Sequence, residues 1–184
     1  MKLVLATQNP KKLKEMNEIL RHLGVEVVSE AELGVRIEVE ETGETFTNNA
    51  HLKATAVMQA TGLPAVCGSA RCVDALNGGP GVYSARFGGE GLDDKGRYTL
   101  LLEMLRGQTD RAAHFHTSIV CAFPNGDELV CEGECPGTIA FAPMGEGGFG
   151  YDPVFMPDGY DKSMAQLGTD FKNTISHRAR ALAK

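Results

Sequence analysis

The fold of this chain is decided first by the stretch Leu3-Val4-Leu5-Ala6-Thr7-Gln8-Asn9-Pro10-Lys11-Lys12. Its first four residues form a short apolar run that predicts a buried strand, and residues 13–20 carry the apolar spacing of a helix. Proline suits the first turn of that helix, because its missing N–H costs nothing there. The turn between the two elements therefore places unpaired N–H groups, polar side chains and two lysines at a helix N-terminus.

Such a terminus favours anionic ligands, because its N–H groups and the helix dipole both attract negative charge. The whole chain has a formal net charge of -6, so any phosphate site must be locally basic, and Lys11 and Lys12 supply that charge. Many α/β proteins begin with the same three parts and bind nothing there. The turn is not a P-loop, since the G-x-x-x-x-G-K-[ST] pattern is absent.

The composition is that of a soluble globular protein. The 184 residues are 42% hydrophobic and 23% charged, which suits one domain or one domain with two lobes. The acidic balance argues against binding of duplex nucleic acid, and no apolar run of about 18 residues predicts a membrane span. Five cysteines without a secretory leader favour reduced thiols in the cytoplasm, and Cys131-x-x-x-Cys135 lacks the second pair that a structural zinc site needs.

Further elements follow from periodicity. Residues 45–60 predict a helix with Phe46, Ala50, Ala54 and Val57 on its apolar face and Asn49 and Lys53 on the other. Residues 112–123 alternate as a strand, and the turn at 124–127 returns the chain into a second strand over 128–131. Shorter strands are expected at 65–67, 72–76 and 136–141, and a helix at 98–105. Together they predict an α/β fold with an antiparallel component.

The last helix is expected to follow Thr169. Its spacing places Phe171, Ile175, Ala179 and Leu182 toward the core, and Lys172 and Ser176 on a flank.

Three segments are unusual for a purely structural protein, although each has a plain structural interpretation. Glu40-Glu41 precede the helix that carries Lys53, and helix-dipole complementarity alone would explain them. Residues 147–153, Gly-Gly-Phe-Gly-Tyr-Asp-Pro, present aromatic rings on a glycine-rich loop that could stack on a base or form a tight turn. Ser176-His177-Arg178 group hydrogen-bond donors that could read a heterocycle or face solvent.

Taken together, these segments resemble one family over the full chain. The shared motifs are T-x-N-x-x-K at 7–12, E-T-G-x-T-F-x-x-N-A-x-x-K-A at 41–54, V-D-A-L-x-G-x-P-G-V-Y-S-A-R at 73–86, G-G-F-G-Y-D-P at 147–153 and K-x-x-x-S-H-R at 172–178. The chain resembles the inosine triphosphate pyrophosphatases, also called non-standard purine NTP pyrophosphatases or dITP/XTP pyrophosphatases. The resemblance implies one domain over 1–184 with an elongated, two-lobed α/β fold. It also implies a long mixed central sheet flanked by helices, an active-site cleft between the lobes, and a homodimer.

The resemblance also implies roles for particular residues. The triphosphate would contact Thr7, Asn9, Lys12, Lys53 and Lys172, and the base and sugar would contact Phe149, Gly150, Tyr151, Asp152, His177 and Arg178. The substrate would also contact Gln8, Pro10, Lys11 and Ser69. Glu40 would bind Mg²⁺, with Glu41 in reserve. One segment departs from the family: A-D-D-S-G-L is replaced by residues 67–71, one residue shorter, with Cys72 following, so the catalytic aspartate would fall at Gly68 or Ser69.

The expected activity is hydrolysis of ITP, dITP or XTP to the monophosphate and pyrophosphate. The missing aspartates favour a rival, a nucleotide-binding family member with impaired catalysis. The related Maf-like pyrophosphatases lack the segments at 147–153 and 176–178. A structural or interaction module would leave the lysine and loop motifs unexplained.

Overall fold

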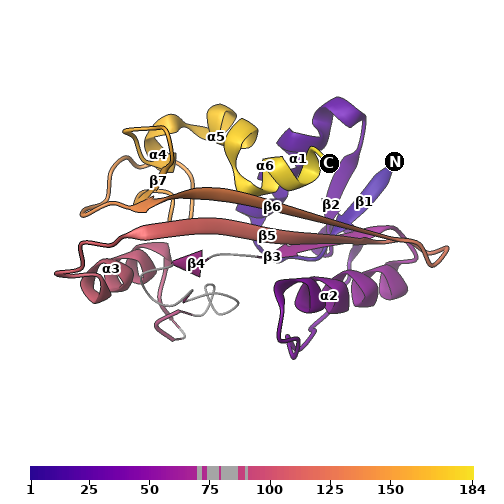
Figure 1. The fold of residues 1–184 in the computed structure, drawn as a ribbon. Helices are drawn as coiled ribbons and strands as arrows, with labels where there is room; N and C mark the ends of the chain where they lie inside the picture. Colours follow the sequence, from indigo (N-terminus) through magenta and orange to yellow (C-terminus); the bar gives the residue numbers. More distant parts are fainter. Residues whose placement is uncertain (70–71, 74–78, 80–86, 90) are drawn as a thin grey trace. The chain divides into compact units, whose positions relative to one another are not determined.

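The computed structural model describes residues 1–69, 72–73, 79, 87–89 and 91–184. The chain divides into two compact units, one formed by 1–69, 117–133 and 178–184 and the other by 70–116 and 134–177. A single sheet has the strand order β2-β1-β3-β5-β6-β7, with β4 also paired to β5 (Figure 1). The predicted mixed α/β fold is therefore confirmed. Within the described residues, no helix is long and apolar enough to cross a membrane.

The first unit is built on three parallel strands. β1 (Lys2–Leu5) lies between β2 (Glu26–Ser29) and β3 (Ala65–Ser69), and β3 pairs in antiparallel fashion with β5 (Ala112–Ala122). The helix α1 (Pro10–Leu20) and the short 3₁₀ turn η1 (Arg21–Leu23) lead from β1 to β2. The turn η2 (Ala31–Leu33) and the helix α2 (Phe46–Thr61) then lead to β3.

Two apolar clusters cover the two faces of this part of the sheet. One joins Ala50, Ala54 and Val57 of α2 to Val4 and Val120 of the strands, as the periodicity of residues 45–60 predicted. The other joins α1 and the C-terminal helix α6 (His177–Leu182) to the opposite face, through the residues Met16, Leu20, Ala181, Leu3, Leu5, Val27, Val66 and Ile119. Figure 1 shows α2 on one side of these strands and α1 and α6 on the other.

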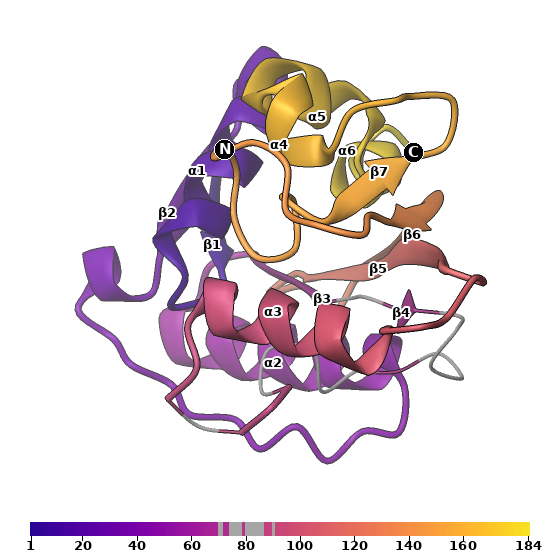
Figure 2. The same ribbon diagram turned by 90° about the vertical axis from the view of Figure 1, so that its left-hand side faces the viewer.

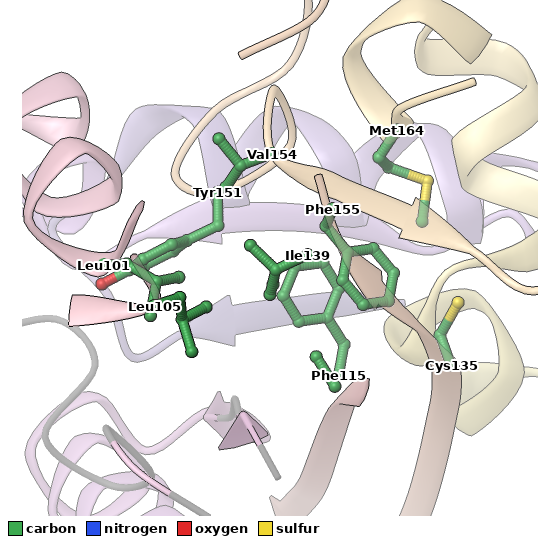
Figure 3. Close-up of a cluster of buried hydrophobic side chains, with 10 residues drawn as sticks. Leu101, Leu105, Phe115, Cys135, Ile139, Tyr151, Val154, Phe155 and Met164 are labelled. Carbon is green, nitrogen blue, oxygen red and sulfur yellow. The ribbon is translucent and has the colours of Figure 1, made fainter. Parts of the chain in front are cut away.

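The second unit has a single aromatic core. The helix α3 (Asp94–Met104) contributes Leu101 and Leu105, and the strands β5, β6 (Glu128–Ile139) and β7 (Phe155–Pro157) contribute Phe115, Ile139 and Phe155. The rings of Phe115 and Phe155 stack with centroids 4.0 Å apart, as the close-up in Figure 3 shows. The short helix α4 (Met164–Leu167) adds Met164 to this core, and α5 (Thr169–Ile175) follows it, as the second view shows (Figure 2).

Arg111 fastens three parts of the second unit together. Its guanidinium donates hydrogen bonds to the carbonyl oxygens of Leu105, Ile139 and Ala140 at 2.7–2.9 Å. The ring of Phe141 lies 4.5 Å from the guanidinium carbon. Burial lowers the pKa of this arginine, but its charge is matched by carbonyl dipoles and an aromatic face.

The C-terminal helix differs from the prediction. A continuous helix was expected after residue 169, but Ser176 adopts an extended ψ of 158° and separates α5 from α6. Phe171 is consequently exposed, where it packs edge-on against Tyr160, so its predicted core position is wrong. Lys172 and Ser176, which were predicted on a flank of the helix, are both buried.

Other differences are smaller. The strands expected at 128–131 and 136–141 are one continuous strand, and α3 begins four residues before the predicted helix. The strands β2 and β7 were not predicted. Residues 74–76 of an expected strand, and most of the motif at 73–86, lie outside the described residues.

Candidate nucleotide site

The first unit has the strand arrangement that makes a ligand site in open α/β sheets. β1 is central, and its two neighbours are reached by connections that leave in opposite directions. Ligands bind outside the carboxyl ends of the strands at such a point. Thr7 to Pro10 follow β1 here, Gly68 and Ser69 end β3, and the Ala6 N–H donates to the Val66 carbonyl at 2.8 Å to join the two ends.

The turn after β1 is organised by Asn9, which caps α1. Its Oδ1 accepts a hydrogen bond from the Lys11 N–H at 2.9 Å, and its N–H donates to Thr7 Oγ1 at 3.3 Å. Pro10 occupies the first helical turn, as predicted. The N–H groups of Lys11 and Lys12 were expected to be unpaired, and this expectation is wrong, because Asn9 accepts both. The side chains of Lys11 and Lys12 therefore supply the positive charge at this turn.

A cavity of about 410 Å³ adjoins this turn. Thr7, Gln8, Asn9 and Pro10 line one side of it, and Ser29–Ala31, with Val35 and Arg36, line the other. Its volume is within the usual range for small-molecule sites. The four turn residues that the sequence assigned to a ligand therefore share one concave surface.

Charged side chains from separate elements converge at the end of β3. Lys53 of α2 forms an ion pair with Glu41, and both side chains are partly buried. Burial raises the pKa of the Cys67 thiol, while the charges of Lys53 and Lys12 oppose that rise and Glu41 adds to it. Lys12 and Lys53 therefore both act electrostatically on Cys67 of β3, although they are far apart in sequence.

The acidic segment before α2 is held by Asn49. This buried side chain accepts from the Gly43 N–H at 2.7 Å and donates to the Gly43 carbonyl at 2.9 Å. Asn49 and Lys53 share one face of α2, as predicted, and both bind the segment at residues 41–43, Asn49 from a buried position. Glu40 is exposed, and Glu41 is committed to Lys53. Of the two acids, Glu40 is the one that is open to a metal ion.

The position expected for the catalytic aspartate is ordinary strand backbone. Gly68 pairs with Ile119 and Ser69 with Ser118 across β5. A Cβ on Gly68 would lie 3.1 Å from Ile119 Cγ1 and 3.4 Å from Thr117 Oγ1. The Thr117 hydroxyl is buried and has no hydrogen-bond partner in the described part of the chain. No group of three or more potential metal ligands occurs among the described residues.

In the second unit, the glycine-rich loop closes on a buried ion pair. Lys172 Nζ lies 2.6 Å from Asp152 Oδ2, with side-chain exposures of 6% and 4%. The same oxygen accepts from the Phe149 N–H at 2.8 Å, and Lys172 Nζ lies 4.1 Å from the centre of the Phe149 ring. Tyr151 is buried beside Leu101 and Leu105 (Figure 3), so it acts as a core anchor, whereas Phe149 is half-exposed.

His177 and Arg178 are both buried, and the chain passes from the second unit to the first between them. The His177 ring lies 5.1 Å from that of Phe115 in the second unit. Arg178 donates from Nη1 to Glu15 Oε2 at 2.7 Å in the first unit, and both side chains are at most 6% exposed. An exposed polar face was one interpretation of Ser176 to Arg178, and the burial of all three residues rules it out.

Sequence reasoning missed three residues that hold these groups in place, Glu15, Asn49 and Asp94. Glu15 binds Arg178, and the carboxylate of Asp94 accepts from the Gly150 N–H at 2.8 Å. Glu15 and Asp94 gave no signal, because a charged residue of a helix is expected on the surface unless a partner pairs with it. Asn49 could have been found, since a polar residue next to the apolar position 50 needs a partner when buried.

The carboxyl ends of the parallel strands are followed by lysines, and a separate loop carries aromatic residues. These features are typical of α/β proteins that bind phosphorylated ligands. The chain belongs to the Ham1 family, whose model matches residues 3–184. It is similar to a dITP/XTP pyrophosphatase of Desulforamulus reducens, with 48% identity over all of this chain and 93% of the relative.

Solved structures agree with this assignment. A HAM1 protein from Coxiella burnetii has a TM-score of 0.87 and 40% identity, covering 100% of this chain and 95% of that one. A nucleoside-triphosphatase, dITP/XTP pyrophosphatase, from Mycobacterium abscessus has a TM-score of 0.77 and 44% identity, covering 100% and 97%.

Proposed function

We propose that this protein hydrolyses non-standard purine nucleoside triphosphates, ITP, dITP or XTP, to the monophosphate and pyrophosphate. The observation that supports the proposal is the turn from Thr7 to Pro10, which follows β1, lines a cavity of about 410 Å³ and leads directly into Lys11 and Lys12 of α1. A triphosphate and its departing pyrophosphate need cationic neutralisation, and lysines positioned by a rigid sheet provide it. The names of the Ham1 relatives supply the substrate class.

The phosphate chain would bind the turn from Thr7 to Lys12 together with Lys53. Lys53 is paired with Glu41 without a ligand, so phosphate binding must exchange one anionic partner for another. That exchange limits the net gain in affinity, because the attraction between Lys53 and Glu41 is lost when the lysine turns to phosphate. Ser69, at the end of β3, is proposed as a further phosphate contact.

A divalent ion is expected in this chemistry, and we propose Mg²⁺. The donor set fits an ion that arrives on the nucleotide, since magnesium is usually held by one or two carboxylates together with phosphate oxygens. Glu40 is exposed and would be its protein ligand, while Glu41 is held by Lys53. The ion would neutralise phosphate charge as the bond between the α-phosphorus and its bridging oxygen breaks.

The base would be recognised by the loop from Phe149 to Asp152 with His177 and Arg178. Phe149, which is half-exposed, would stack on the purine, and hydrogen-bond donors would face the 6-oxo group. Adenine presents an amino donor at that position, and such a mismatch can cost about four to five orders of magnitude. Lys172 was expected to contact the triphosphate. Its buried pair with Asp152 instead supports a role in holding this loop.

The position of Gly68 and Ser69 bears on the rate. Neither residue can act as a carboxylate base. The attacking water would therefore have no aspartate at this position to accept its proton. We therefore propose a slow enzyme of the Ham1 family. We also propose that residues 1–184 form one catalytic domain, that the protein is a homodimer and that it acts in the cytoplasm.

The decisive experiment measures pyrophosphate released from ITP, dITP, XTP and ATP with magnesium present. We expect the non-standard purines to react at least about a hundredfold faster than ATP. Lys53→Ala should weaken ITP binding by about 1.5–3 kcal/mol, the scale for a lost hydrogen bond to a charged group.

The matched control is Lys14→Ala, which removes an exposed α1 lysine paired with Glu18 and should leave ITP binding unchanged. Equal rates for ITP and ATP, or release of single phosphates, would contradict the proposed reaction.

A further inference from the structure

Helix α3 begins with two consecutive acids that have different partners. Asp93 caps its own helix, with Oδ1 accepting from the Gly96 N–H at 2.7 Å. Asp94 instead reaches a separate segment, with Oδ2 accepting from the Gly150 N–H at 2.8 Å. Asp94 and Gly150 are far apart in the sequence. An acid in the first turn of a helix ordinarily interacts with the N-terminus of that same helix, so this contact is unusual.

The partner of Asp94 is the backbone of the aromatic loop. Two successive N–H groups there are bound by carboxylates, that of Phe149 by Asp152 and that of Gly150 by Asp94. Gly150 is buried and has a φ of 64°, a conformation that few other residues adopt readily. Hydrogen bonds with an ionised acceptor are short and about twice as strong as neutral ones, so two of them fix the loop backbone at adjacent residues.

The two carboxylates come from different sides of the loop. Asp152 belongs to the loop itself and is tied to α5 through Lys172, whose ammonium lies under the Phe149 ring. Asp94 is the tie from α3. Without it, the peptide between Phe149 and Gly150 would be held by Asp152 from one side alone, and the plane of the Phe149 ring would lose a constraint.

We propose that Asp94 is a positioning residue for purine recognition, which sets the orientation of Phe149 through the Gly150 amide. This inference rests on the proposed function, because it takes Phe149 to be the surface on which the base stacks. Asp94 would not contact the nucleotide. Its effect should therefore appear in the base-dependent part of binding and be absent from the phosphate-dependent part.

The test compares the affinities of ITP and of inorganic triphosphate, which has no base. In Asp94→Ala we expect ITP to bind about tenfold more weakly, the lower end of what a lost hydrogen bond to a charged group produces. Triphosphate affinity should stay unchanged. Asp94→Asn keeps an acceptor and should lie between the two. The matched control is Asp93→Asn, which removes one charge from the same turn and keeps a good helix cap.

Hydrogen exchange at the Gly150 amide gives a second readout that needs no ligand. Exchange should accelerate in Asp94→Ala and stay at the wild-type rate in Asp93→Asn. Unchanged ITP affinity in Asp94→Ala, with the wild type still preferring ITP over triphosphate, would overturn this inference alone. If the wild type bound ITP and triphosphate equally, the proposed base recognition itself would be wrong.

Discussion

Lys172 was assigned from the sequence to a helix flank and a phosphate contact, and its ammonium is buried against Asp152. Breaking a buried ion pair leaves one charge without a partner and costs about 3–5 kcal/mol. We therefore expect Lys172→Ala to lower the free energy of unfolding by that amount, measured by urea denaturation. An unchanged urea midpoint would show that Asp152 is solvated when Lys172 is absent.

The control for this prediction removes both charges. The double variant Lys172→Met with Asp152→Asn should recover most of the lost stability, because an apolar replacement of a buried pair is often neutral. The amide that this variant carries at position 152 still offers an acceptor to the Phe149 N–H. Lys53→Ala, at a partly buried and more solvated pair, should change stability by less than about 1 kcal/mol.

At the scale of elements, the long hairpin of β5 and β6 carries two cysteines whose thiols interact. Burial, and then the neighbouring Cys131, raise the pKa of Cys121 from its usual value of 9.0 to about 11. The thiolate is the reactive form, so Cys121 should alkylate slowly near neutral pH. Its labelling rate should keep rising between pH 9 and 11, as followed by mass spectrometry with iodoacetamide. A plateau reached by pH 9 would contradict the shift.

The same pKa shift affects stability with a definite sign. A thiol that holds its proton more tightly when folded contributes its full stability below pH 9. That contribution is lost as the pH rises from 9 through 11, because the unfolded chain ionises first. Cys121 is only partly buried, so the loss should be modest.

Elements with strong local signals were predicted well, and those set by tertiary contacts were not. The strand, turn and helix at the N-terminus were confirmed because apolar period and Pro10 agree there. The strand β7 is only three residues long, and β2 has only two apolar residues, Val27 and Val28, so neither gave a clear signal. The break at Ser176 has no glycine or proline to mark it, so an unbroken helix was the better prediction from sequence alone.

Over the whole molecule, the candidate site also has parts that local sequence predicts and parts that only tertiary contacts determine. Residues that would touch a ligand lie in recognisable motifs, and Thr7 to Pro10 do line one cavity. Their supporting partners Glu15 and Asp94 belong to distant elements, so only the folded chain shows them. The cleft that the resemblance implied stays a prediction.

Turnover by the whole protein should depend on the segment at residues 67–71. Rebuilding Ala-Asp-Asp-Ser-Gly-Leu in place of these five residues, with Cys72 kept, should raise the rate of ITP hydrolysis by about 10²–10⁴, the usual worth of a positioned base. ITP affinity should change little, because the lysines are untouched. Steady-state pyrophosphate release, with binding measured separately, checks both parts.

A variant with Gly68→Ala is the control for packing, since its Cβ meets Ile119 without supplying a carboxylate. It should fold and remain as slow as the starting protein. Equal rates for the rebuilt and starting proteins would show that carboxylates in this segment are dispensable here.

The three hydrogen bonds that Arg111 donates to carbonyl oxygens limit which substitutions evolution can accept at this position. Some arginine codons become lysine codons by a single base change, and the exchange preserves charge. A lysine carries its donors on one nitrogen, so it could not span the three carbonyls that end α3 and β6. Purifying selection at this codon should therefore reject a substitution that charge-based scoring matrices rate as mild.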